Sequence, residues 1–326
     1  MASGAGASVG EMATVRLGRT DLDVSVAGLG CGGHSRLGQA RGASEAESIA
    51  VVHRALDLGI TFFDTARAYR TEEIVGKALA GRRDEVVISS KALVDRLDDH
   101  DYRASAAELR DSVHKSLRRL GTDHIDVFHL HGVRAPVYDH CREVLVPELL
   151  ALRDEGSVRH LAISEAFIAE PGHEMLPRAL ADDVWDVVMV GFNLLNPSAR
   201  ARVLETTRAR DVGTLAMFAV RRALSQPDEL RRVCAELVGS GHVPEGALDA
   251  DDPLGFLVHE GGAISVVEAA YRFVRHEPGI DVVLTGTGST EHLEENVRAI
   301  LAPPLPADDL ARLAELFGTV DHLSGN

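Results

Sequence analysis

The stretch GITFFDTARAY, residues 59–69, carries the pattern that decides the fold of this chain. It is a short apolar run that stops at Asp64 and is followed by Tyr69. Near-continuous apolar runs of this length are typical of parallel strands that are buried on both faces. Two further stretches have the same form, an apolar run that ends in one ionisable residue: EVVISSKA (85–92), with Lys91, and HIDVFHLHG (124–132), with His131.

Apolar runs of this kind recur along the whole chain, and stretches with apolar residues at helical spacing lie between them. Eight strand–helix units in 326 residues predict one closed (β/α)8 TIM barrel, since such barrels need ~250 residues plus insertions. The fold class is therefore α/β. The predicted strands are VSVAGLG (24–30), GITFFD (59–64), EVVISS (85–90), IDVFHLH (125–131), VRHLAIS (158–164), WDVVMVGF (185–192), VGTLAMF (212–218) and IDVVLTG (280–286).

Three segments fall outside the eight units. Residues 13–24 alternate around a turn and predict an N-terminal β-hairpin that caps the bottom of the barrel. Residues 1–12 lack the basic start and apolar stretch of a signal peptide, so we expect a flexible leader before a barrel domain at 13–326. The stretch 221–262 and the segment after His131 are expected to form long loops at the carboxyl-terminal face, where the pocket is built.

Composition narrows the classes of partner. The net charge of −16 argues against nucleic acid and anionic membranes, and no apolar run approaches the ~18 residues of a membrane span. Three scattered cysteines without a C-x-x-C pair favour a reduced, cytoplasmic protein over a disulfide scaffold. The expected partner is a small-molecule carbonyl or alcohol, and the oligomeric state is left open.

The four ionisable residues at the strand ends point to proton transfer to or from an oxygen atom. A tyrosine with its ordinary pKa near ~10 is a poor acid–base catalyst, but a neighbouring Lys91 ammonium would lower the pKa of Tyr69. Asp64 would keep Lys91 protonated, and His131 would donate a hydrogen bond to a substrate carbonyl. Tyr69 is then the general acid in ketone reduction, or the base in alcohol oxidation, and a cofactor has to supply or accept the hydride.

Together, FFDTA-x-x-Y, SSK, D-x-x-x-x-H, a serine after the fifth strand and a late G-x(9)-N segment resemble the aldo-keto reductase family. The resemblance extends from about Val15 to Ile300. It implies a TIM barrel, a nicotinamide cofactor bound without a Rossmann domain, and a catalytic tetrad. The residues that match this tetrad are Asp64, Tyr69, Lys91 and His131.

The resemblance also implies a cofactor site on the other strand ends. NADPH/NADP is the expected cofactor, with NADH/NAD left open. The late segment LTGTGSTEHLEEN (284–296) would hold phosphate at a helix amino terminus. The residues expected to bind the cofactor are Gly30, Cys31, Gly32, Ser164, Glu165, Met189, Phe192, Phe218, Val220, Arg222, Gly286, Thr287, Ser289, His292, Glu295 and Asn296.

Several of these positions depart from the family pattern. Glu165 stands where the family usually has an asparagine that grips the nicotinamide carboxamide, and Met189 stands where it has a glutamine. Phe192 replaces a tyrosine and is expected to stack on the nicotinamide ring. Glu295 and Asn296 match the adenine-binding pair, while His292 stands where a basic residue often holds the 2′-phosphate.

Two of these motifs also fit other kinds of site, a Rossmann dinucleotide site and a metal site. GLGCGG (28–33) fits the Rossmann pattern G-x-G-x-x-G, but loop residues follow it instead of a helix, and the next strand ends too late, at Asp64. A tight turn approached by the cofactor is favoured. His129 and His131 share one side of a strand, as in metal-dependent barrels, but the later strand ends offer no good further ligand, so no metal is predicted.

The sequence therefore predicts a cytoplasmic NADPH-dependent enzyme that reduces an aldehyde or ketone to an alcohol. A first alternative is an NAD(P)-dependent sugar or polyol dehydrogenase that works in the oxidative direction. A second is a nicotinamide-binding regulatory subunit. The sequence does not identify the substrate, because the pocket is expected to be lined by loops, and loop sequences do not specify the shape of a ligand.

Overall fold

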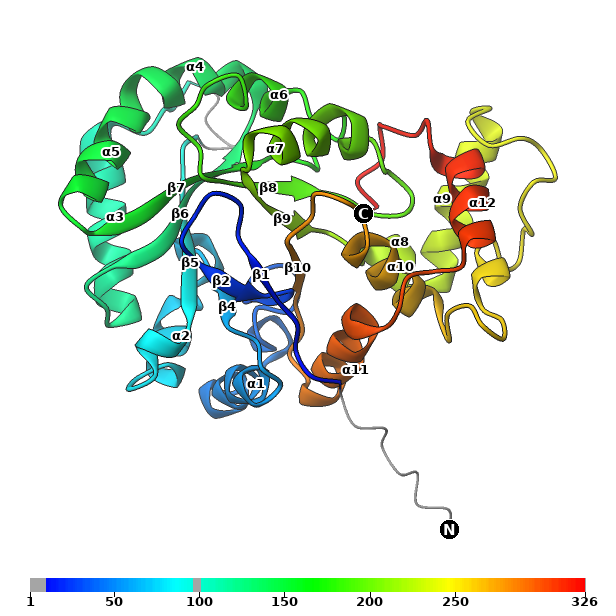
Figure 1. Cartoon of the computed structure of the whole chain (residues 1–326), viewed down its shortest axis with the longest axis horizontal. Coiled ribbons are helices and arrows are strands. Elements are labelled where there is room, and N and C mark those ends of the chain that lie inside the picture. Colours follow the sequence, from blue (N-terminus) through cyan, green and yellow to red (C-terminus); the bar gives the residue numbers. More distant parts are fainter. Residues whose placement is uncertain (1–9, 96–100, 326) are drawn as a thin grey trace, which may run out of the picture.

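The computed structural model describes residues 10–95 and 101–325, and within them eight parallel strands close into a barrel (Figure 1). The strand order around the barrel is β10-β3-β4-β5-β6-β7-β8-β9. Each predicted strand is found, which confirms the TIM barrel. The strands are β3 (Ala27–Gly30), β4 (Phe62–Asp64), β5 (Val87–Leu93), β6 (Ile125–Val133), β7 (Val158–Glu165), β8 (Val187–Gly191), β9 (Gly213–Met217) and β10 (Val282–Thr285).

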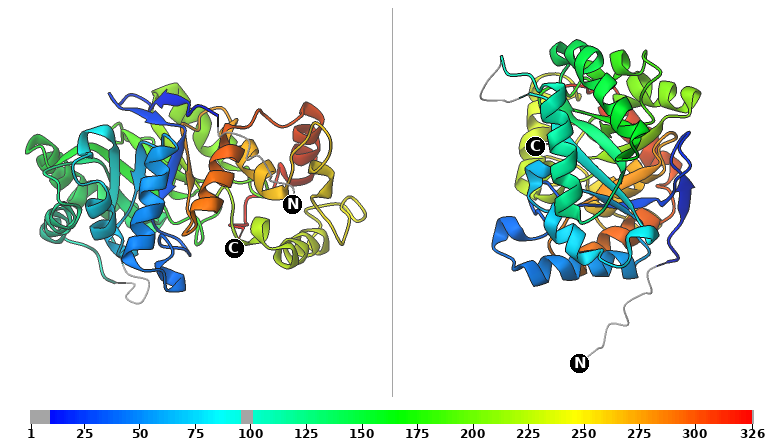
Figure 2. Two further views of the ribbon diagram at one scale, coloured as in Figure 1. Left: turned by 90° about the horizontal axis from the view of Figure 1, so that it is seen from below. Right: turned by 90° about the vertical axis from the view of Figure 1, so that its left-hand side faces the viewer.

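Helices cover the outside of the barrel, as the connecting amphipathic stretches predict (Figures 1 and 2). Ser44 and Ser105 begin two of them, and each forms a capping box with the glutamate three residues later. The helices are α1 (Glu45–Asp57), α2 (Glu72–Ala78), α3 (Ala106–Leu120), α4 (Tyr138–His140), α5 (Val146–Asp154), α6 (Met175–Ala179), α7 (Glu205–Arg210), α8 (Arg222–Ser225), α9 (Pro227–Gly239), α10 (Val266–Arg275), α11 (Thr290–Leu301) and α12 (Ala307–Phe317).

Two apolar layers hold the barrel together. The larger one lies between the strands and the helices. The smaller one fills the barrel interior with side chains such as Phe62, Val127 and Met189. Leu17 and Leu22 join this inner layer from the N-terminal hairpin, in which β1 (Thr14–Arg16) pairs antiparallel with β2 (Asp23–Ser25). The hairpin therefore closes the amino-terminal end of the barrel, as predicted, and leaves the carboxyl-terminal end for the site.

The predicted long segment 221–262 is partly helical. It contains α8, α9 and a 3-10 helix at Gly255–Leu257, and it lies with α12 at one side of the barrel (Figures 1 and 2). Residues 1–9 of the expected leader lie outside the described part of the chain. No helix in the described ranges is both long and apolar enough to cross a membrane.

Candidate active site

Asp64 and Lys91 form a buried ion pair at the carboxyl ends of β4 and β5. The Lys91 Nζ atom lies 2.5 and 2.6 Å from the two carboxylate oxygens and 3.0 Å from the Thr65 carbonyl oxygen. These three acceptors surround the ammonium group, which also interacts with the Tyr69 hydroxyl. Ser89 donates a further hydrogen bond of 2.8 Å to Asp64. The carboxylate raises the pKa of Lys91 despite the opposing effect of burial, so the ammonium is held charged and fixed in place.

Tyr69 lies against this pair. It ends a 3-10 helix at Arg67–Tyr69 that directly follows β4, and the Lys91 Nζ atom lies 4.9 Å from the centre of its ring. A Cβ atom placed on Gly32 would lie 2.5 Å from two ring carbons of Tyr69, so only glycine at position 32 allows the ring to sit there.

The pKa of Tyr69 differs in direction from the sequence-based expectation. Burial of the phenol raises the pKa, and this effect outweighs the lowering by the nearby Lys91 ammonium. Asp64 adds to the rise because its negative charge disfavours a phenolate. The phenol is therefore held protonated at neutral pH, which suits a proton donor better than a proton acceptor.

His131 completes the group, with its Nε2 atom 3.3 Å from the Tyr69 Oη atom. Burial and the positive charge of Lys91 lower the pKa of His131 to about 3, so the imidazole is neutral. Its Nδ1 atom is buried without a hydrogen-bond partner among the described residues. A buried N–H without an acceptor costs more than an unused lone pair, so we place the single proton on Nε2.

This tautomer determines the direction of the hydrogen bond between the two side chains. His131 donates its Nε2 proton to the Tyr69 oxygen, and the Tyr69 hydroxyl proton is then free to point at a ligand. His129 lies two residues earlier on β6, fully buried, and burial and Lys91 hold its pKa well below the ordinary value. The structure thus brings together all four residues expected from the sequence. It adds Thr65 and Ser89, which lie within the motifs FFDTA-x-x-Y and SSK but were not predicted as site residues, and it places Gly32, predicted to bind the cofactor, against the Tyr69 ring.

Comparison with known proteins shows to which family the chain belongs. Residues 28–317 match the Aldo/keto reductase family. The chain belongs to this family. Aldo/keto reductases are oxidoreductases that use nicotinamide cofactors, so the protein is an NAD(P)H-dependent oxidoreductase.

Sequence relatives and a solved structure cover most of the chain. An uncharacterized oxidoreductase of Bacillus subtilis, YqkF, is 27% identical over 311 residues, covering 91% of this chain and 94% of YqkF. The aldo-keto reductase YhdN of the same organism is 29% identical over 78% of each chain. The holo-form structure of aldo-keto reductase AKR11C1 from Bacillus halodurans has a TM-score of 0.70 at 24% identity, covering 96% of this chain and all of that one.

Among the residues expected to hold the nicotinamide, Ser164 faces the site. Its hydroxyl oxygen accepts a hydrogen bond of 2.9 Å from the backbone N–H of Gly132, the residue after His131. Met189 points into the barrel interior, where it packs in the inner apolar layer. Glu165 is buried and bound to His173, a residue that sequence analysis missed.

Phe192 does not lie where it was expected. Side chains alternate along β8, and since Val187 and Met189 point inward, the following even-numbered residues point outward. Phe192 accordingly lies in the outer layer, fully buried, with its ring stacked on Phe273 at a centroid distance of 5.5 Å. Because the ring is fully buried and stacked on Phe273, it is not exposed for stacking on a nicotinamide.

The residues predicted to bind the cofactor at the ends of β3 and β9 lie in different environments. Gly30 ends β3, and Cys31 is a buried thiol whose backbone N–H donates to the Asp64 carbonyl oxygen at 2.7 Å. Phe218 has a positive φ of 68°, and the guanidinium of Arg221 lies 3.9 Å above its ring. Val220 is partly buried against the outer layer, whereas Arg222 is exposed and paired with Glu229 at 3.0 Å.

The late segment forms the turn into α11. The first backbone N–H groups of α11, which follows Gly286 and Thr287 in the chain, lack acceptors within the helix. Such N–H groups are suited to binding a phosphate. The Ser289 hydroxyl already caps the helix by accepting the His292 backbone N–H at 3.2 Å. Asn296 donates to Thr285 Oγ1 at 2.9 Å, whereas the side chains of His292 and Glu295 are exposed.

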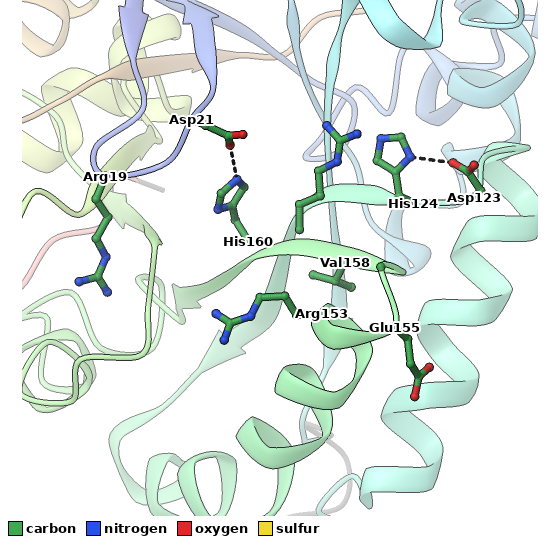
Figure 3. Close-up of a pocket in the computed structure, with 10 residues that line it drawn as sticks. Arg19, Asp21, Asp123, His124, Arg153, Glu155, Val158 and His160 are labelled. Atoms are coloured by element: carbon green, nitrogen blue, oxygen red, sulfur yellow. Dashed lines mark hydrogen bonds and ion pairs between the residues drawn. The ribbon is translucent and has the colours of Figure 1, made fainter.

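A separate hollow of about 720 Å³ lies at the opposite end of the barrel (Figure 3). It is lined by residues around the starts of β6 and β7, including Arg19, Asp21, His124 and His160. The side chains of Asp21 and His160 pair at 2.9 Å, and Asp123 pairs with His124 at 2.7 Å. Strand beginnings are not where barrels of this kind carry chemistry, so the tetrad marks the candidate active site.

Proposed function

We propose that the protein is a cytoplasmic NADPH-dependent carbonyl reductase that converts an aldehyde or ketone to an alcohol. The observation that carries the proposal is the position of Tyr69, whose Oη atom lies 3.3 Å from the Nε2 atom of His131 and whose ring lies beside the buried Lys91–Asp64 pair. The three cysteines are all buried and unpaired, which supports a reducing compartment.

The residues at the site divide the work of carbonyl reduction. When bound, reduced nicotinamide supplies a hydride for the carbonyl carbon. Tyr69 donates its hydroxyl proton to the oxygen on which negative charge develops. Lys91 stabilises the phenolate that remains, and Asp64 keeps Lys91 charged and oriented. His131 donates its Nε2 proton to the phenol oxygen in this arrangement, in place of the hydrogen bond to the substrate carbonyl that was expected from the sequence.

The remaining strand ends fit a nicotinamide dinucleotide. Ser164 would hold the carboxamide, because its hydroxyl accepts the Gly132 N–H and keeps its own proton available as a donor. The open N–H groups of the first turn of α11 would hold a phosphate, and Glu295 and His292 remain exposed for the adenosine end.

Turnover with a panel of carbonyl compounds and alcohols tests the proposal. The purified protein would be assayed in both directions with NADPH/NADP⁺ and NADH/NAD⁺, following absorbance of the reduced cofactor. We expect faster aldehyde or ketone reduction with NADPH than with NADH. Turnover confined to alcohol oxidation with NAD⁺ would instead favour a dehydrogenase, and absence of turnover with measurable cofactor binding would favour a regulatory subunit.

The choice between the two cofactors gives a second prediction. His292→Arg should tighten binding of NADPH more than binding of NADH, because a guanidinium pairs with a phosphate through two hydrogen bonds. Kd values for both reduced cofactors would be measured by fluorescence titration. Equal changes in the two Kd values would place residue 292 away from the 2′-phosphate.

The close contact between Gly32 and Tyr69 gives a third prediction. Gly32→Ala should displace the Tyr69 ring and lower kcat by about 10- to 100-fold, since misplacement of a reacting group by 1 Å can have this effect. Gly239→Ala on α9 is the control, because the new methyl group would meet no atom from another part of the chain within 4 Å. A Gly32→Ala enzyme with unchanged kcat would show that the position of Tyr69 does not limit the reaction.

A further inference from the structure

Two buried threonine hydroxyl groups link the ends of β3 and β4 beside Tyr69. Thr71 follows Tyr69 by two residues, and its Oγ1 atom lies 3.0 Å from the Cys31 carbonyl oxygen and 3.0 Å from the Thr65 Oγ1 atom. Thr65 and Thr71 are both fully buried. A hydroxyl group has a single proton, and the carbonyl oxygen can only accept. Thr71 therefore donates to Cys31 and accepts from Thr65.

The carbonyl that Thr71 holds belongs to the peptide group between Cys31 and Gly32. The backbone N–H of Cys31 is also bonded, since it donates to the Asp64 carbonyl oxygen at 2.7 Å. These two hydrogen bonds together orient the backbone that enters Gly32. This backbone packs so closely on the Tyr69 ring that a Cβ atom on Gly32 would lie 2.5 Å from two ring carbons. The Thr71 hydroxyl thus fixes the surface on which the Tyr69 ring rests.

Thr71 does not take the role that is usual for its position in the chain. It is the N-cap residue of α2, where a threonine hydroxyl ordinarily accepts a backbone N–H from the first turn of the helix. No such hydrogen bond is formed, because the hydroxyl is turned toward Cys31 and Thr65. Departures from a local preference of this kind are expected at functional sites.

Glu72 holds the start of α2 in place, so that Thr71 projects from a rigid position. Its buried carboxylate accepts hydrogen bonds of 2.6 Å from the Ser90 hydroxyl and 2.6 Å from the Arg119 Nε atom. A buried carboxylate needs partners of this kind to offset the loss of water. Ser90 lies on β5, directly before Lys91, and Arg119 lies on α3. The first residue of α2 is therefore tied to two neighbouring elements.

The segment 64–72, which carries Tyr69, is fastened on both sides. Each side chain of the SSK motif at 89–91, on β5, donates a hydrogen bond to this segment. β3 and β5 are the two strands that flank β4 in the barrel. The hydrogen bond from Thr71 to Cys31 adds a side-chain link on the β3 side. Support of this kind around a reacting group is what keeps its geometry precise.

We propose that Thr71 is a positioning residue for carbonyl reduction. By holding the Cys31–Gly32 peptide against the Tyr69 ring, it keeps the phenol hydroxyl at the point from which the proton is donated. The inference rests on the proposed function, because it takes Tyr69 as the proton donor. Thr71 acts only through Tyr69 in this account and contacts neither substrate nor cofactor.

Thr71→Val tests the role of the hydroxyl group. Valine keeps the branched shape of the side chain and removes both hydrogen bonds. We expect kcat for carbonyl reduction to fall by about tenfold, since misplacement of a reacting group by ~1 Å can lower a rate by as much as ~100-fold. The Kd for NADPH, measured by fluorescence titration, should change little, because the Tyr69 hydroxyl is assigned to the substrate oxygen.

Thr71→Ser keeps the hydroxyl group and removes a buried methyl group. Its kcat should stay close to that of wild type, even though the midpoint of chemical denaturation falls. Thr207→Val is the matched control away from the site. Thr207 is buried on α7, and its hydroxyl donates to the Leu204 carbonyl oxygen at 3.2 Å. Loss of this hydroxyl should leave kcat unchanged.

A double-mutant cycle with Tyr69→Phe separates positioning of the phenol from a general loosening of the barrel. If Thr71 acts through the Tyr69 hydroxyl, adding Thr71→Val to Tyr69→Phe should lower the residual kcat little further. A general loosening would lower kcat by the same factor with or without the Tyr69 hydroxyl. Residual rates would be measured in single turnovers, following the absorbance of bound NADPH.

Three outcomes would overturn the inference. The first is an unchanged kcat in Thr71→Val, and the second is an equal loss of kcat in Thr71→Ser and Thr71→Val. The third is an effect of Thr71→Val that is equally large in the wild-type and Tyr69→Phe backgrounds. Failure of the proposed function would be recognised separately, because wild type would then reduce no carbonyl compound or Tyr69→Phe would keep full turnover.

Discussion

Tyr69→Phe should lower kcat for carbonyl reduction by at least about 100-fold, the effect typical of losing a general acid. The substitution removes only the hydroxyl group, and the ring can still pack on Gly32 and beneath the Lys91 ammonium. The proton for the developing alkoxide then has to come from water. Cofactor Kd values should change little, because the hydroxyl is assigned to the substrate oxygen.

Tyr138→Phe provides a matched control for this substitution. Tyr138 is also buried, and its hydroxyl donates to Asp182 at 2.6 Å in the outer apolar layer, on α4. Its loss should lower the thermal midpoint without lowering kcat. Near-wild-type turnover in Tyr69→Phe, or an equal loss of kcat in both variants, would contradict the assignment of Tyr69 as the acid.

Lys91→Met should impair both the chemistry and the stability of the protein. Without the ammonium, Asp64 raises the pKa of Tyr69 unopposed, and the phenol becomes a weaker acid. Reduction requires the protonated phenol and fails as the pH rises through its pKa. The activity that remains should therefore be much lower, and its alkaline limit should move to higher pH.

The loss of stability has a separate cause. Asp64 would remain buried with Ser89 as its side-chain hydrogen-bond partner, and removal of one member of a buried ion pair costs about 3–5 kcal/mol. Chemical denaturation would measure this loss. The double variant Asp64→Asn/Lys91→Met removes the uncompensated charge, so it should recover much of the stability but not the activity. A single variant with unchanged stability and pH profile would show that Lys91 neither holds the core nor tunes Tyr69.

Much of the fold could be predicted from the sequence because its signals are local. Each strand is a short apolar run, and each long helix has a helical period and often a serine cap, as at Ser44 and Ser105. The tetrad could be predicted for the same reason: each member follows or ends a strand, and parallel strands bring their carboxyl ends together.

The rest of the site depends on contacts that have no sequence period. His173 lies in a connecting segment eight residues after Glu165, and nothing in its surroundings marks it as a partner of that carboxylate. The direction of the Tyr69 pKa depends on the balance between burial and a nearby charge, which requires coordinates. The outward position of Phe192 also required coordinates, because residues 187–190 are all apolar and only the packing of Val187 and Met189 in the barrel interior shows which face each residue takes.

Transfer of a labelled hydride tests the central claim most directly. The protein would be given an aldehyde and NADPH that carries deuterium in place of the transferable hydrogen at C4 of the nicotinamide. We predict that the alcohol product carries one deuterium on the former carbonyl carbon in each molecule formed, and that the rate falls together with kcat in Tyr69→Phe. An unlabelled alcohol, or consumption of the cofactor without formation of an alcohol, would contradict the account.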